Sequence, residues 1–135
     1  MKRTIGRKER ADIPEFGLKD RVVKIDTGAY TSSIHVESAV VKNEQLHVVF
    51  SKDAPEGKFF DLWETKKVKS SNGISVERYT IEGDIRLGNV TYTTKFTLTN
   101  RSKMKYPVLL GRRLLNRNFI VDTSKVNLLS ATSNN

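Results

Sequence analysis

The most informative stretch of this 135-residue chain is Val22-Val23-Lys24-Ile25-Asp26-Thr27-Gly28-Ala29. Its β-branched residues predict a short strand that ends at Asp26. Asp26 would then lie on a turn, where Gly28 lets a second stretch of backbone approach closely. Taken alone, Asp-Thr-Gly is also typical of an Asx turn that merely follows a strand. The tripeptide therefore indicates a catalytic carboxylate only where the rest of the chain supports it.

A second apolar stretch, Val108-Leu109-Leu110-Gly111-Arg112-Arg113-Leu114-Leu115, lies near the other end of the chain. The three apolar residues before Gly111 predict a buried strand. The residues after the glycine predict the one helix of the chain, at 112–116, with Leu114 and Leu115 as its apolar positions.

The rest of the chain has the pattern of short strands separated by turns. Residues 90–98 alternate strictly between two faces, which is the period of a half-buried strand. Further strands are expected at 46–50, 60–69, 74–87 and 120–121. Gly88-Asn89 and the segment Ser70–Gly73 predict hairpin turns, because Asn-Gly suits the positive φ values of tight turns. This pattern favours an all-β sandwich or barrel with one short helix.

The two stretches together resemble those of retroviral-type aspartic peptidases, in which an apolar-apolar-Gly-Arg element packs beneath the catalytic loop. The order of elements agrees, because the tip at 70–73 lies where that family has the flap that covers the substrate. Most of the chain is similar to one bacterial retropepsin-like family labelled as an ATP-dependent zinc protease, whose members accompany or are fused to ATP-grasp, RimK-like glutamate ligases. The matching segments are Ile5-Gly6, Glu9, Pro14–Leu18, Lys24–Ala29, Thr31-Ser32, Ile34-His35, Leu98–Arg101, Met104, Tyr106-Pro107, Leu109–Arg112 and Val121-Asp122. Tyr30 departs from the family, which has arginine there, and this places the family's substrate preference in question for this chain.

The resemblance implies an all-β, retropepsin-like acid-protease barrel with one short C-terminal helix, acting as an aspartic endopeptidase. We expect one such domain over residues 1–135, with an ordered core at about 5–129. Asp26 would be the catalytic residue, Thr27, Gly28 and Ala29 would form the active-site loop, and Arg112 would brace the fold. The candidates for substrate binding are Thr31, Ser32, Asn72, Gly73, Arg78 and Arg101. For each of these, a structural role on a strand or in an exposed hairpin is the alternative.

An aspartic peptidase needs two carboxylates that share one proton, because like charges about 3 Å apart do not both ionise. This chain has one Asp-Thr-Gly. Asp122-Thr123-Ser124 lacks the glycine and has only eleven residues after it, too few for a second lobe. We therefore expect a C2 homodimer in which each protomer contributes Asp26.

The sequence contains few residues of the kinds that bind a metal ion or a cofactor. The chain has no cysteine, and its two histidines, His35 and His47, are twelve residues apart, without a metal-ligand motif. We expect no metal and no cofactor, and His35 is expected to be structural. No phosphate-binding glycine loop is present, so any use of ATP would belong to a partner such as an ATP-grasp ligase.

Charge favours acidic partners. The 24 lysines and arginines exceed the 15 acidic residues and give a net charge of +9, which suits a peptide or glutamate-tailed substrate. Two other readings stay open: a catalytically silent module that docks to a ligase, and a basic β-barrel that binds RNA or the ribosome. Nucleic-acid binding is the weaker of these two alternatives, because the aromatic residues do not form a stacking platform. No apolar run is long enough to span a membrane, so we expect a cytoplasmic protein without membrane contact.

Overall fold

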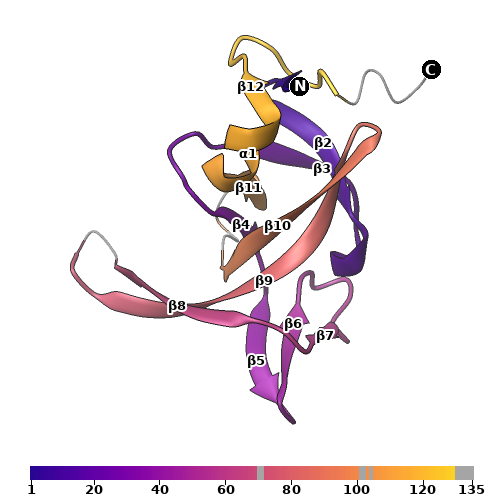
Figure 1. The fold of residues 1–135 in the computed structure, drawn as a ribbon. Helices are drawn as coiled ribbons and strands as arrows, with labels where there is room; N and C mark the ends of the chain where they lie inside the picture. Colours follow the sequence, from indigo (N-terminus) through magenta and orange to yellow (C-terminus); the bar gives the residue numbers. More distant parts are fainter. Residues whose placement is uncertain (70–71, 101–102, 104, 130–135) are drawn as a thin grey trace.

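The computed structural model describes residues 1–69, 72–100, 103 and 105–129. It is built mainly of strands (Figure 1). The strands are β1 (Arg3–Ile5), β2 (Lys8–Ile13), β3 (Leu18–Ile25), β4 (Ser32–His35), β5 (Ser38–Lys42), β6 (Gln45–Val49), β7 (Lys58–Phe60), β8 (Glu64–Lys69), β9 (Ser75–Leu87), β10 (Val90–Thr99), β11 (Val108–Leu110) and β12 (Phe119–Val121). The helices are a 3₁₀ turn, η1 (Pro14–Phe16), and α1 (Arg112–Asn118).

Six of these strands close into a barrel. They are hydrogen-bonded in the order β10-β4-β11-β3-β2-β9, and β9 pairs back onto β10. Within the barrel, β11 lies between β3, to which it is parallel, and β4, to which it is antiparallel. This placement joins the two informative stretches of the sequence, because the ends of β3 and β11 lie side by side.

The long strand β9 serves two parts of the molecule. Residues 80–87 lie in the barrel, where buried residues alternate with more exposed ones from Ile81 onward, whereas residues 75–79 leave the barrel and pair with β8. The β8–β9 hairpin therefore projects from the body of the barrel (Figure 1). The loop between β3 and β4, which contains Asp26, lies on the same side of the molecule (Figure 1).

Two smaller sheets complete the fold. Strands β5, β6 and β7 form an antiparallel sheet beside the barrel, and β1 pairs with β12 in parallel. An aromatic cluster joins the 3₁₀ turn to the barrel, since the ring of Phe16 stacks on Phe50 at 4.7 Å and meets Phe96 edge-on at 5.6 Å between centroids. Gly83 is required there, because a Cβ on it would lie 2.5 Å from the Phe16 ring.

Glu9 is a fully buried carboxylate that ties the two ends of the chain together. Its Oε2 atom accepts the backbone N–H groups of Gly6 and Leu128, each at 2.9 Å, and its Oε1 atom accepts that of Leu129 at 3.0 Å. Buried charges are tolerated when they are hydrogen-bonded in this way. The C-terminal segment is thus held by an acidic side chain from β2.

The predicted barrel with one short helix is confirmed, and α1 extends two residues beyond the expected 112–116. The continuous strand expected at 60–69 is wrong: β7 pairs with β6, whereas β8 pairs with β9. The predicted turn at Ser70–Gly73 falls partly outside the described residues, although Gly73 has the expected positive φ of 85°. The hairpin turn at Asn43 and Glu44, both with positive φ, was not expected.

Candidate active site

The Asp26 loop begins where β3 ends. The backbone N–H of Asp26 donates to the carbonyl of Leu110 at 2.9 Å, which extends the pairing of β3 with β11 by one residue. The N–H of Gly28 donates to Asp26 Oδ1 at 3.0 Å, so the carboxylate is oriented by its own loop. A Cβ on Gly28 would lie 3.3 Å from that oxygen. Asp26 is half-buried, whereas Thr27 and Gly28 are exposed.

The start of α1 supports the same loop. The N–H groups of Arg112 and Arg113 donate to the carbonyls of Ala29 and Tyr30, each at 2.8 Å. The Arg112 side chain donates to the Thr27 carbonyl at 3.0 Å, and its guanidinium lies over the Tyr30 ring, 5.8 Å from the centroid. This geometry agrees with the bracing role expected for Arg112.

Ser32 belongs to this support. Its side chain is completely buried, and its hydroxyl accepts the N–H of Gly111 at 3.0 Å. The expectation that Ser32 binds substrate is therefore corrected, because its hydroxyl is turned into the protein. Thr31, the residue before Ser32, is half-buried and lies in the segment between β3 and β4. Its role in substrate binding stays a prediction.

A row of outward-facing side chains crosses the barrel beside Asp26. We call Lys8, Lys24, Leu109, Ser33 and Thr97 the outer row; each residue is the cross-strand partner of the next, on β2, β3, β11, β4 and β10. All five are half-buried, whereas their neighbours along each strand are buried. Because side chains alternate between faces, Asp26 lies on the same face as Lys24.

The outer row was not predicted from the sequence. Period-two alternation around Asp26 could have assigned Lys24 and Leu109 to one face, since Ile25, Val108 and Leu110 are apolar. The order of the strands was the missing information.

The β8–β9 hairpin contains the turn that the resemblance assigns to a flap. Near its tip, Asn72 Oδ1 accepts the N–H of Ile74 at 3.3 Å, and Gly73 is exposed. At its base, the Arg78 side chain donates a short hydrogen bond to the Thr99 hydroxyl on β10. Arg78 therefore fastens the hairpin to the barrel, which favours the structural alternative for this residue. Arg101 lies outside the described residues.

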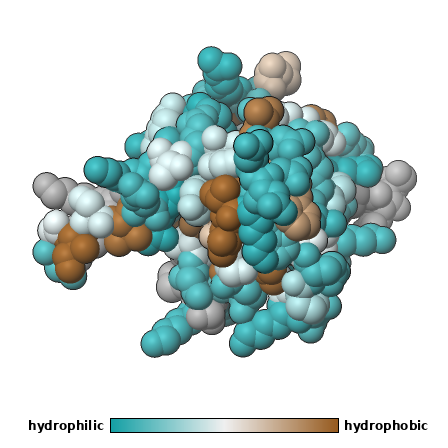
Figure 2. Space-filling model, turned by 90° about the horizontal axis from the view of Figure 1, so that it is seen from below, coloured by the Kyte–Doolittle hydropathy of each residue, from teal (hydrophilic) through white to brown (hydrophobic). Residues whose placement is uncertain are grey.

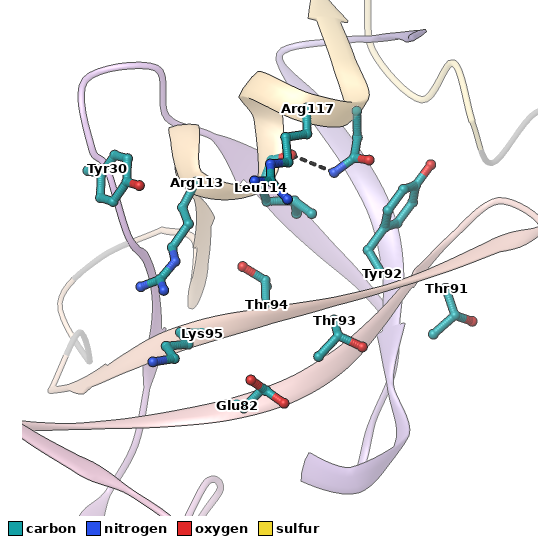
Figure 3. Close-up of a pocket in the computed structure, with 11 residues that line it drawn as sticks. Tyr30, Glu82, Thr91, Tyr92, Thr93, Thr94, Lys95, Arg113, Leu114 and Arg117 are labelled. Atoms are coloured by element: carbon teal, nitrogen blue, oxygen red, sulfur yellow. Dashed lines mark hydrogen bonds between the residues drawn. The ribbon is translucent and has the colours of Figure 1, made fainter. Parts of the chain in front are cut away.

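A pocket of about 620 Å³ between α1 and β10 does not include Asp26. Arg113 and Lys95 extend into it from opposite sides, and Glu82 lies below them (Figure 3). Tyr30, which belongs to the loop between β3 and β4, also lines this pocket (Figure 3). We locate the candidate site at the loop, because the loop carries the carboxylate of the Asp-Thr-Gly motif.

The described residues offer no set of metal ligands. They contain no group of three or more histidine, aspartate or glutamate side chains that could hold a metal ion. Among these same described residues, no helix has the length and apolar character to cross a bilayer.

The chain is similar to known proteins over most of its length. The family model for RimB-like proteins, described as the retropepsin-like aspartic endopeptidase RimB, matches residues 4–130. Two curated relatives, from Shewanella pealeana and Shewanella halifaxensis, are each named "Probable alpha-L-glutamate ligase" and are 35% identical over 133 residues. The match covers 90% of this chain but only 28% of each relative, so the chain spans less than a third of their length.

A solved structure of a Legionella pneumophila protein of unknown function shares the fold. It is 30% identical, and the superposition has a TM-score of 0.70 and covers 93% of this chain and 97% of that one.

Proposed function

Since the chain belongs to the RimB-like family of retropepsin-like aspartic endopeptidases, we propose that it is a homodimeric aspartic hydrolase that cleaves peptide or peptide-like amide bonds. Asp26 of each protomer supplies one carboxylate of the catalytic pair. The observation that carries this proposal is the Asp26 loop, whose carboxylate is oriented by the Gly28 N–H and whose backbone is fixed by β11 and α1.

The chemistry follows from two carboxylates at close range. One stays protonated, because both do not ionise at about 3 Å separation. The ionised carboxylate takes a proton from water, and the resulting nucleophile attacks the scissile carbonyl. The protonated carboxylic acid donates a hydrogen bond to the oxygen that gains negative charge. The tetrahedral intermediate then breaks its C–N bond, and the proton taken from water passes to the leaving nitrogen. The pair titrates as a unit.

A second copy of the chain supplies the second carboxylate. Asp122 does not fill that role, because its carboxylate accepts hydrogen bonds from the Ser124 N–H at 3.0 Å and the Ser124 hydroxyl at 2.6 Å in the turn after β12. Thr27 and Gly28 are exposed at the tip of the loop, which suits a contact between two loops across a C2 axis. The small residues there permit close approach.

The β8–β9 hairpin closes the cleft over the substrate. Ile74 is 61% exposed and Val76 is 45% exposed on this hairpin, and Figure 2 shows hydrophobic side chains gathered on the projecting arm at the left. A two-stranded hairpin alone is marginally stable. A substrate or a second protomer beneath it would cover these side chains and exclude water from the reacting bond.

The substrate is a peptide with an acidic segment, such as a glutamate tail. The net charge of +9 attracts acidic chains, and the matched relatives carry the name of a glutamate ligase. The same finding favours a second candidate function, in which the chain is a catalytically silent module that docks to such a ligase, because the relatives contain the matching segment within a longer protein.

The test is cleavage of a mixed peptide library that includes oligoglutamate-tailed peptides, read by mass spectrometry. Wild type should cleave and Asp26→Asn should not. A covalently joined pair of protomers with one Asp26→Asn should be as inactive as the pair with two, whereas the joined wild-type pair should cleave. Equal cleavage by the joined pair with one substitution would refute the shared dyad. Absence of cleavage by wild type would favour the docking module.

A further inference from the structure

Three lysines gather around one tyrosine at the edge of the outer row. The Nζ atoms of Lys8 and Lys105 lie 5.7 and 5.6 Å from the centroid of the Tyr106 ring. Lys24 is close enough for its charge to act on the phenol. We call Lys8, Lys24, Lys105 and Tyr106 the lysine cluster. Two of its members, Lys8 and Lys24, also belong to the outer row.

The cluster concentrates the positive charge of three lysines beside one another. Lys8 and Lys24 are direct cross-strand partners on β2 and β3, and like charges in that position destabilise a sheet. Among the residues that the structure describes, none of the three lysines forms an ion pair. Proteins retain such destabilising pairs mainly at functional sites, such as ligand-binding sites.

Tyr106 responds to the same charges. Partial burial raises the pKa of its phenol, but the hydrogen bond with Lys8 and the charges of Lys105, Lys8 and Lys24 outweigh that effect, and the pKa lies below its ordinary value. The lysines therefore already stabilise negative charge at this point. An external anion placed among them would experience the same field.

The position of the cluster relative to Asp26 suggests what that anion is. Lys24 lies two residues before Asp26 on the same face of the barrel, which is about 7 Å along a strand. That spacing corresponds to a substrate residue next to the scissile bond. The neighbour of Lys24 in the outer row is Leu109, a half-buried apolar side chain. The surface beside Asp26 thus has an apolar side chain, Leu109, next to the ammonium groups of Lys24 and Lys8.

We propose that the lysine cluster is a carboxylate-binding subsite of the cleft, which holds the carboxylate of a peptide residue beside the reacting bond. A glutamyl side chain fits it best, because its methylene groups would lie on Leu109 while its carboxylate reaches Lys24 and Lys105. A carboxylate at the end of a peptide offers the same chemistry. The assignment to a cleft rests on the proposed function, whereas carboxylate binding does not require turnover.

The test is therefore a binding measurement on the full chain carrying Asp26→Asn, by calorimetry. The probes are three otherwise identical peptides: one with a central Glu and blocked ends, one with a central Gln and blocked ends, and the Gln peptide with a free C-terminal carboxylate. We expect the Glu peptide to bind about tenfold more tightly than the blocked Gln peptide, the effect of charge-assisted hydrogen bonds. Tighter binding of the free-ended Gln peptide instead would assign the subsite to a chain end.

Matched variants separate the cluster from general charge. Lys105→Met, at an exposed position, should remove most of the preference for Glu, and Tyr106→Phe should weaken it. Lys42→Met, exposed on the separate strand β5, makes the same change in net charge and should leave the preference intact. Equal affinity for all three peptides, no binding of any of them, or equal losses in Lys105→Met and Lys42→Met would overturn the proposal. If wild type cleaves no peptide but the preference for the Glu peptide persists, the proposed hydrolase is refuted and the carboxylate-binding subsite is not.

Discussion

Gly111 offers the sharpest test of how the Asp26 loop is held. Its φ of −99° is available to any residue, so Gly111→Ala changes contacts and not backbone strain. The added Cβ would lie 2.7 Å from the carbonyl oxygen of Tyr30 and 2.9 Å from that of Ala29. These are the carbonyls that accept the N–H groups at the start of α1. Because both contacts are backbone, relief requires the loop and the helix to separate.

The magnitude follows from these contacts. Overpacking of this kind costs about 1–3 kcal/mol, and a weakened hydrogen bond adds about 1 kcal/mol, so we expect Gly111→Ala to lose about 2–4 kcal/mol of unfolding free energy. Urea denaturation should show a lower midpoint with an unchanged slope. Because misplacement of reacting groups by about 1 Å can slow a reaction about 100-fold, peptide cleavage should fall more than stability alone explains.

The control is Asn116→Ala, on the exposed side of the same helix, which should change the unfolding free energy by less than about 0.5 kcal/mol. A Gly111→Ala protein with the midpoint and the activity of wild type would show that the start of α1 does not hold the loop.

Three further changes test other contacts. Ser32→Ala leaves the buried N–H of Gly111 without its acceptor and should cost about 1–3 kcal/mol in urea denaturation; an unchanged midpoint would contradict the supporting role. Glu9→Gln replaces one accepting oxygen by an amide donor and should cost about 2 kcal/mol, whereas a neutral result would mean that the backbone donors find other partners. The hydrogen bond with Lys95 lowers the pKa of Glu64, so this pair adds stability above the unfolded-state pKa of Glu64 and loses it as the pH falls through the lowered folded value. Lys95→Met should raise the Glu64 pKa in a carboxyl NMR titration, and no change would refute the pairing.

Much of the fold was predictable because alternation along a strand is a local property. The strand expected at 90–98 is β10, which extends by one residue to Thr99. Pairing partners are not local, which is why residues 60–69 were expected to form one strand. The chain leaves the β5–β6–β7 sheet at Phe60 and joins β9 only at Glu64. The turn at Asn43 and Glu44 was missed because glutamate at positive φ is not a turn signal.

The candidate site was predictable to a smaller extent. Asp26 and its loop lie in one contiguous motif, and Gly111-Arg112 completes it from a second one. The outer row requires the register of five strands and the insertion of β11 between β3 and β4, which no single stretch of sequence contains. Ser32 was expected on the surface because the sequence does not contain the order of the strands. In the structure its hydroxyl is buried and accepts the N–H of Gly111.

The buried Glu9 carboxylate has a consequence for how the protein is made. Its acceptor atoms bond to Leu128 and Leu129, 119 and 120 positions away in sequence. During synthesis Glu9 leaves the ribosome long before these partners, so a core that closed earlier would bury the Glu9 carboxyl group without two of its hydrogen-bond donors. Contacts of such long sequence separation form slowly, and domains generally fold as units as they emerge. We therefore expect this domain to reach its native state only after its final segment has left the ribosomal tunnel, and ribosome-stalled chains that end before Leu128 should remain sensitive to proteases.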